Sequence, residues 1–226
     1  MPAEGALRHG TGPDSGQPDF ELIETMRWEP DAGFLRFERH LARLYASAAE
    51  LGFACDPQRV GEALSHAVAQ SGGTLRVRLA LSRHGDVTAS AQPYEPLAVD
   101  KVWALRLSRS RLDSTDPLLR HKTSRRQVYT HARSEYLITQ ADEVLLANER
   151  GELCEGTITT LFADFGGPAL VTPRLDCGLL AGALRAEMLE TGKAEEAVFS
   201  FDDLKAAKAV FVGNSLRGLI PARLAH

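Results

Sequence analysis

The stretch His121–Arg126, HKTSRR, decides how the rest of this chain is interpreted. Together with Arg120 it gathers five basic side chains, with Lys122 among them. Taken alone, the stretch is typical of a solvated basic turn at the start of a helix. If it were buried, however, desolvation and cationic neighbours would lower the pKa of the Lys122 amine and make it nucleophilic toward an aldehyde. That is the chemistry by which a lysine forms a Schiff base with pyridoxal phosphate (PLP).

Such a cofactor needs further partners, and the sequence offers candidates for each. The pyridine nitrogen requires a carboxylate that keeps it protonated, and Glu155 lies in an apolar segment after Gly151. The phosphate requires backbone N–H groups at a helix N-terminus. Gly182 directly precedes an expected helix, so the N–H groups of Ala183 and Leu184 are candidates.

Two more side chains could complete a phosphate site. Ser215 lies in a glycine-bounded turn, GNSLRG, after an expected strand. Arg43 lies at the edge of the apolar face of an amphipathic helix expected over 37–51. The alternative for Arg43 is a side chain that buries its stem and extends its charge into water.

Composition limits the classes of protein to which the chain can belong. It has 226 residues, a net charge of −4 and 44% hydrophobic residues, which excludes a disordered, collagenous or coiled-coil chain. The acidic balance argues against nucleic-acid binding. The three cysteines, Cys55, Cys154 and Cys177, lack a metal-type spacing, so we expect reduced thiols and no metal site.

The sequence also suggests where the protein works and how it is divided. No apolar run approaches the roughly 20 residues of a membrane span, so we expect a cytoplasmic protein without membrane contact. Residues 1–19 resemble a flexible leader. We predict an N-terminal α/β domain over 20–107, a polar interdomain linker over 108–119 and a C-terminal cofactor domain over 120–226. The mixed order of elements after the linker predicts an α+β or barrel-like second domain.

Six segments in this order resemble the class IV aminotransferases, the fold-type IV PLP enzymes. The resemblance implies an α+β fold like that of branched-chain and D-amino-acid aminotransferases, with a small N-terminal α/β domain and a larger barrel-like C-terminal domain. The segments are LIETMRW (22–28), ERHLARL with SAAELGF (38–53), HKTSRRQVY (121–129), ADEVLLANERGELCEGTITTLF (141–162), TPRLDCGLLAGALR (172–185) and VGNSLRGLIPARL (212–224).

The resemblance assigns roles to residues and implies a homodimer. Lys122 matches the Schiff-base lysine and Glu155 the partner of the pyridine nitrogen. The residues that match the phosphate-binding positions are Arg43, Ala183, Leu184 and Ser215. Thr25 and Arg78 match positions near the substrate. Thr160 departs from the family, in which asparagine is usual at this position.

Within the family, HKTSRR and VGNSLRGLIPARL most resemble members with 4-amino-4-deoxychorismate lyase activity. This resemblance implies release of pyruvate to form 4-aminobenzoate for folate synthesis, with a functional link to an aminodeoxychorismate synthase. The alternatives are an aminotransferase of branched-chain or D-amino acids, and a non-catalytic member. The substrate is a small molecule in either enzyme. Candidates for binding its carboxylates are Arg27, Arg76, Arg78, Arg106 and Arg217.

Overall fold

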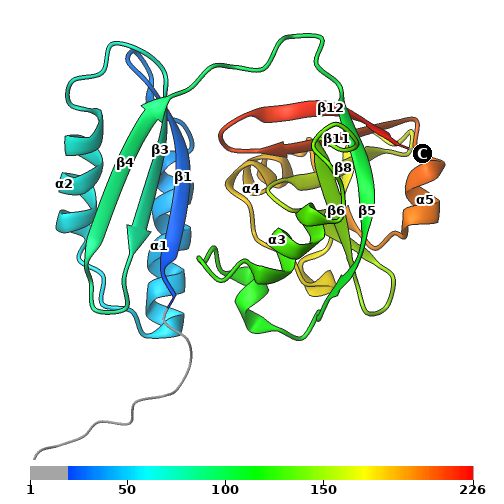
Figure 1. Ribbon diagram of the computed structural model, residues 1–226, viewed down its shortest axis with the longest axis horizontal. Coiled ribbons are helices and arrows are strands. Elements are labelled where there is room, and N and C mark those ends of the chain that lie inside the picture. Colours follow the sequence, from blue (N-terminus) through cyan, green and yellow to red (C-terminus); the bar gives the residue numbers. More distant parts are fainter. Residues whose placement is uncertain (1–19, 226) are drawn as a thin grey trace, which may run out of the picture.

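The computed structural model describes residues 20–225, so the predicted leader over 1–19 lies outside the described part. The chain forms two β-sheets with helices, which lie side by side and are joined by one long connection (Figure 1). This architecture confirms the expected α+β class. None of the helices described is long and apolar enough to cross a membrane.

The first sheet is antiparallel and has the strand order β2-β1-β3-β4. Its strands are β1 (Leu22–Glu29), β2 (Gly33–Phe34), β3 (Leu75–Leu81) and β4 (Val87–Pro93). Two helices, α1 (Phe37–Leu51) and α2 (Pro57–Val68), cover one face and bury a core with it (Figure 1). Since side chains alternate along a strand, the other face is free to meet the second half of the molecule.

The second sheet has eight strands in the order β10-β9-β8-β11-β12-β5-β6-β7. They are β5 (Trp103–Leu112), β6 (Glu143–Asn148), β7 (Leu153–Gly156), β8 (Thr160–Asp164), β9 (Leu170–Pro173), β10 (Ala194–Ala197), β11 (Ala209–Asn214) and β12 (Gly218–Leu224). The helices are α3 (Gln127–Ser134), α4 (Ala183–Glu190) and α5 (Phe201–Lys205), with short 3₁₀ turns at Pro117–Arg120 and Leu175–Cys177. The sheet curls around a core of its own.

The segment that connects the two sheets lies earlier in the chain than the sequence predicts. Strand β5 pairs in parallel with β12 and β6, so it belongs to the second sheet. The predicted linker over 108–119 begins inside this strand, and the connection instead runs over residues 94–102, of which 95–102 are exposed. The prediction was wrong because Arg109 and Arg111 occupy the exposed side of β5 and give it a linker-like composition, whereas Ser108 and Leu112 are buried.

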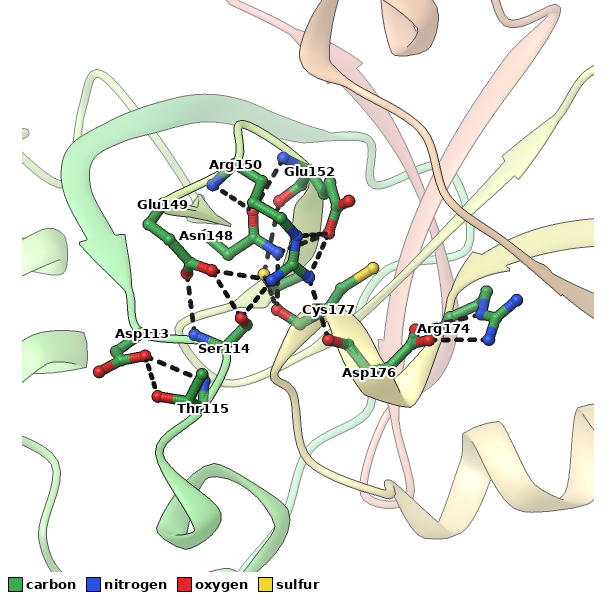
Figure 2. A network of polar contacts seen from close by, with 11 residues as sticks. Asp113, Ser114, Thr115, Asn148, Glu149, Arg150, Glu152, Arg174, Asp176 and Cys177 are labelled. Carbon is green, nitrogen blue, oxygen red and sulfur yellow. Dashed lines mark hydrogen bonds and ion pairs between the residues drawn. The ribbon is translucent and has the colours of Figure 1, made fainter.

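A polar network fixes the turn between β6 and β7 (Figure 2). The guanidinium of Arg150 donates to the carboxylates of Glu149 and Glu152 and to the backbone oxygen of Asp176. Glu149 also accepts hydrogen bonds from Ser114, which follows β5. The network therefore holds the start of β7, the strand that carries Glu155. Because Glu149 and Arg150 are exposed, solvent screens their ion pair, and the network orients the turn more than it stabilises the fold.

Candidate active site

One cavity of about 340 Å³ lies between the two sheets. Its wall comes from β1, β3 and α1 on one side, and from the segments around residues 118–129, 155–160, 180–184 and 214–217 on the other. All eight site residues expected from the sequence line this cavity: Thr25, Arg43, Arg78, Lys122, Glu155, Ala183, Leu184 and Ser215.

Lys122 reaches the cavity because its backbone extends the first sheet. The N–H of Ile23 donates to the Lys122 carbonyl at 2.8 Å, and Leu22 forms a β-bridge with Thr123. Burial, together with the nearby cations Arg43 and Arg126, lowers the pKa of the Lys122 amine from 10.5 to about 8 against the opposing effect of the carboxylates. A sizeable fraction of this amine is therefore neutral near pH 8.

Glu155 is a buried carboxyl group on β7 with a single side-chain partner. The Tyr129 hydroxyl donates to Oε1 of Glu155 at 2.7 Å. Burial raises the pKa of Glu155 to about 7, although the bond from Tyr129, the N–H of Leu180 and the charge of Arg126 oppose the rise. The group is thus poised to share a proton with a basic ring nitrogen. Tyr129 was not assigned from the sequence, although it ends the HKTSRRQVY segment.

The N-terminus of α4 faces the cavity without a side-chain cap. Gly182 occupies the N-cap position in extended conformation, and the helix starts at Ala183. A Cβ atom on Gly182 would lie 2.9 Å from Oγ1 of Thr160, so glycine is required for this close approach. The first N–H groups of the helix and the Ser215 hydroxyl border the same space. This is an arrangement that suits an anion.

Arg43 makes a contact that the sequence did not predict. Its guanidinium donates to both carboxylate oxygens of Glu24, at 2.8 and 2.5 Å, and to the backbone oxygen of Ala181 at 2.9 Å. Burial by itself would raise the pKa of Glu24, but the charge of Arg43 and hydrogen bonds from His40 and Arg43 lower it to about 2. The arginine is therefore held at the cavity by a buried carboxylate. The sequence signal that could have indicated this contact was Glu24, a glutamate among the apolar residues of LIETM (22–26).

His40 is a second residue that sequence reasoning missed. It lies one helical turn before Arg43 on α1 and is almost fully buried. Its Nδ1 atom lies 2.7 Å from Oε2 of Glu24, and its Nε2 atom lies 2.7 Å from Oγ of Ser215. His40 thereby joins a strand and a helix of the first half to the turn after β11 in the second half.

The rest of the cavity is strongly cationic. Arg76 and Arg78 reach it from β3, and Thr25 pairs with Arg78 across β1 and β3. Arg217 lines the opposite wall, 5.7 Å from the centre of the Trp103 ring. The other candidates point elsewhere: Arg27 pairs with Glu29, and Arg106 lies over the Tyr136 ring.

A buried carboxylate shapes the loop after Glu155. Glu143 on β6 is completely buried and accepts hydrogen bonds from the backbone N–H groups of Thr157 and Ile158, both at 3.0 Å. The hydroxyl of Thr159 adds a further bond at 2.8 Å. Because residues 157–159 line the cavity, Glu143 fixes one of its walls from behind.

The sequence pattern that defines the amino-transferase class IV family matches residues 21–225. The chain therefore belongs to the class IV aminotransferases, a family of PLP-dependent enzymes, and the fold-type IV architecture expected from the resemblance is confirmed.

Three relatives illustrate the range of activities in the family. A protein of Schizosaccharomyces pombe, named as a candidate aminodeoxychorismate lyase, is 31% identical over 201 residues, which is 87% of this chain and 86% of the relative. A solved structure of a candidate amino-acid aminotransferase from Mesorhizobium loti is 75% identical, with a TM-score of 0.91 over 92% of this chain and all of that one. The 4-amino-4-deoxychorismate lyase of Pseudomonas aeruginosa is 25% identical, with a TM-score of 0.77 over 90% of this chain and 82% of that one.

The residues at the cavity fit the cofactor of this family. A lysine amine of lowered pKa lies in the same cavity as a buried carboxyl group, and an uncapped helix N-terminus lies beside an arginine and a serine hydroxyl. These are the donors that an aldehyde, a ring nitrogen and a phosphate each require. No group of three or more metal-binding side chains occurs within residues 20–225.

Proposed function

We propose that this chain is a PLP-dependent 4-amino-4-deoxychorismate lyase, which forms 4-aminobenzoate and pyruvate. The observation that carries the proposal is the arginine-lined wall of the cavity that holds Lys122. The names of the Schizosaccharomyces pombe and Pseudomonas aeruginosa relatives support it.

Lys122 and Glu155 would carry the proton chemistry. When bound, PLP supplies an electron sink for the carbon that bears the substrate amine. The neutral Lys122 amine removes the proton from that carbon as a general base, a role for which a pKa near 8 is suited. Glu155 holds a proton at the ring nitrogen, and the Tyr129 hydroxyl fixes its orientation.

The phosphate would be held at the opposite end of the cavity. The donors are the N–H groups of Ala183 and Leu184, the Ser215 hydroxyl and the Arg43 guanidinium. Since Glu24 already accepts two bonds from Arg43, the phosphate meets a partly neutralised arginine. The helix terminus therefore contributes a larger share of the attraction.

The arginines would select a substrate with two carboxylates. Among the described residues, Arg76 and Arg217 form no ion pair, and Arg78 lies 3.5 Å from a half-exposed Glu21. Aminodeoxychorismate carries two carboxylates that could pair with them. A branched-chain amino acid offers one carboxylate and an apolar side chain, so binding it would leave part of this cationic wall without a partner.

A second candidate is an aminotransferase that acts on a dicarboxylic amino acid. The same arginines would serve it, and the Mesorhizobium loti neighbour is named for aminotransferase activity. The two reactions differ in their need for an acceptor, because a transaminase requires a 2-oxo acid and the lyase requires none.

The test is to supply aminodeoxychorismate alone and to measure 4-aminobenzoate by fluorescence and pyruvate by coupled reduction. We expect both products in equal amounts, and none from Lys122→Ala. Conversion of amino acids that depends on an added 2-oxo acid, without 4-aminobenzoate formation, would assign the chain to the aminotransferases instead. An Arg76→Gln variant should raise KM for aminodeoxychorismate more than it lowers kcat.

Three expectations from the sequence remain part of this proposal. We propose a homodimer, a cytoplasmic location and a functional link to an aminodeoxychorismate synthase, which makes the substrate. Light scattering tests the first, fractionation the second, and a coupled assay with the synthase the third.

A further inference from the structure

A chain of three buried polar side chains leads from the first sheet to the proposed phosphate site. Glu24, His40 and Ser215 are exposed by 1%, 1% and 6%, respectively. The Glu24 carboxylate contacts Nδ1 of His40, and Nε2 of His40 contacts the Ser215 hydroxyl, each at 2.7 Å. Ser215 in turn borders the cavity.

The direction of these hydrogen bonds depends on the protonation of His40. An ionised carboxylate only accepts hydrogen bonds, and Glu24 accepts from Arg43 as well, so Nδ1 of His40 carries a proton. In a neutral ring, Nε2 must accept, and the single hydroxyl proton of Ser215 points at His40. The Ser215 oxygen then presents only lone pairs to the cavity.

Lone pairs repel a phosphate dianion, whereas a hydroxyl donor attracts it. We propose that His40 is a positioning residue that takes up a proton when the phosphate of the cofactor binds, so that Nε2 donates to Ser215 and the Ser215 hydroxyl donates to the phosphate. The proton comes from solvent, and no covalent bond changes. The inference rests on the phosphate placement of the proposed function.

The charges around His40 are compatible with this uptake. Glu24 on β1 touches the ring, and Arg43 on α1 opposes a positive charge there. Arg36, at the start of α1, donates to the Ser215 carbonyl at 3.3 Å but is paired with Glu187 on α4. Lys122 faces the same cavity. A bound phosphate adds the negative charge that favours the imidazolium.

The experiment compares PLP with pyridoxal, which lacks the phosphate, on the apo-protein between pH 7 and 9. The titration of Lys122 affects both ligands and cancels in the ratio of their Kd values. The phosphate itself loses its second proton near pH 6, below this range. We expect the advantage of PLP over pyridoxal to fall with rising pH, by up to about tenfold per pH unit where the uptake of one proton accompanies phosphate binding.

Two variants test whether His40 and Ser215 cause the pH dependence of the PLP advantage. In His40→Gln and in Ser215→Ala the PLP advantage should be smaller and independent of pH, since no proton has to be taken up. The role of His40 would be overturned if the ratio of the two Kd values in wild type did not change with pH, or if its pH dependence were the same in His40→Gln as in wild type. Should His40→Gln not fold, an unchanged slope in Ser215→Ala would have the same meaning.

Calorimetry in buffers of different ionisation enthalpy gives an independent readout. We expect more protons to be taken up on binding of PLP than on binding of pyridoxal at pH 8. In His40→Gln, the number of protons taken up should be the same for both ligands. If PLP binds no more tightly than pyridoxal, or if Ser215→Ala leaves the advantage intact, the phosphate placement itself is wrong. A tight, phosphate-dependent but pH-independent binding instead contradicts only the role of His40.

Discussion

Replacing Lys122 with methionine should abolish activity and at the same time stabilise the apo-protein. Lowering the Lys122 pKa from 10.5 to about 8 means that folding disfavours the charged amine by about 3 kcal/mol. Methionine keeps the length of the side chain and removes the charge, so we expect Lys122→Met to gain up to about 3 kcal/mol in unfolding free energy at pH 7.

The stability difference between Lys122→Met and wild type should depend on pH, in a direction set by the pKa of Lys122 in the folded and unfolded states. Below pH 8 the lysine is charged in both states, and the full cost is present. As the pH rises from 8 toward 10.5, only the unfolded state stays charged, so the cost falls and wild type approaches the variant in stability. Above 10.5 the amine is neutral in both states and the difference vanishes.

Urea denaturation of apo-protein at pH 7 and pH 10 measures both effects. The matched control is Lys193→Met, which removes an exposed amine and should change the unfolding free energy by less than about 0.5 kcal/mol at either pH. If Lys122→Met is no more stable than wild type at pH 7, or if its gain is equal at both pH values, the burial argument for Lys122 is refuted.

Three further changes test other parts of the site. Tyr129→Phe removes the hydroxyl bond to Glu155, which should raise the pKa of Glu155 above about 7 and weaken PLP binding about tenfold in a spectroscopic titration; unchanged affinity would contradict this. Glu143→Gln disrupts a buried carboxylate with several donors and should lower the unfolding free energy by about 2–4 kcal/mol, whereas a loss below about 0.5 kcal/mol would show that the loop holds itself. Gly182→Ala should weaken PLP binding because its Cβ would press on Thr160, and Thr160→Ala should restore the affinity if this contact is the cause.

The parts of the site that could be predicted from sequence are those defined by local patterns. Lys122, Glu155 and the glycine before α4 each stand in a short segment with a recognisable residue pattern, and the structure brings them to one cavity. The first sheet and its two helices were also predictable, because β3 alternates apolar and polar residues and α1 repeats apolar residues every three or four positions.

What could not be predicted depends on contacts between distant segments. His40 and Ser215 are 175 positions apart, and only the folded chain brings them together. Arg27 and Arg76 are opposite each other in the register of β1 and β3, yet only Arg76 lines the cavity. Strand β5 was assigned to the wrong half, because a strand with arginines on its exposed face has the composition of a linker.

The central claim is that Lys122 is the residue that binds the cofactor covalently. Borohydride reduction of the purified holoprotein, followed by peptide mapping, tests this most directly. We predict loss of the visible absorbance and a single pyridoxyl group on the peptide that contains Lys122, with no label in Lys122→Ala. A label on another lysine, or no covalent label after reduction of a protein that contains PLP, would contradict the account.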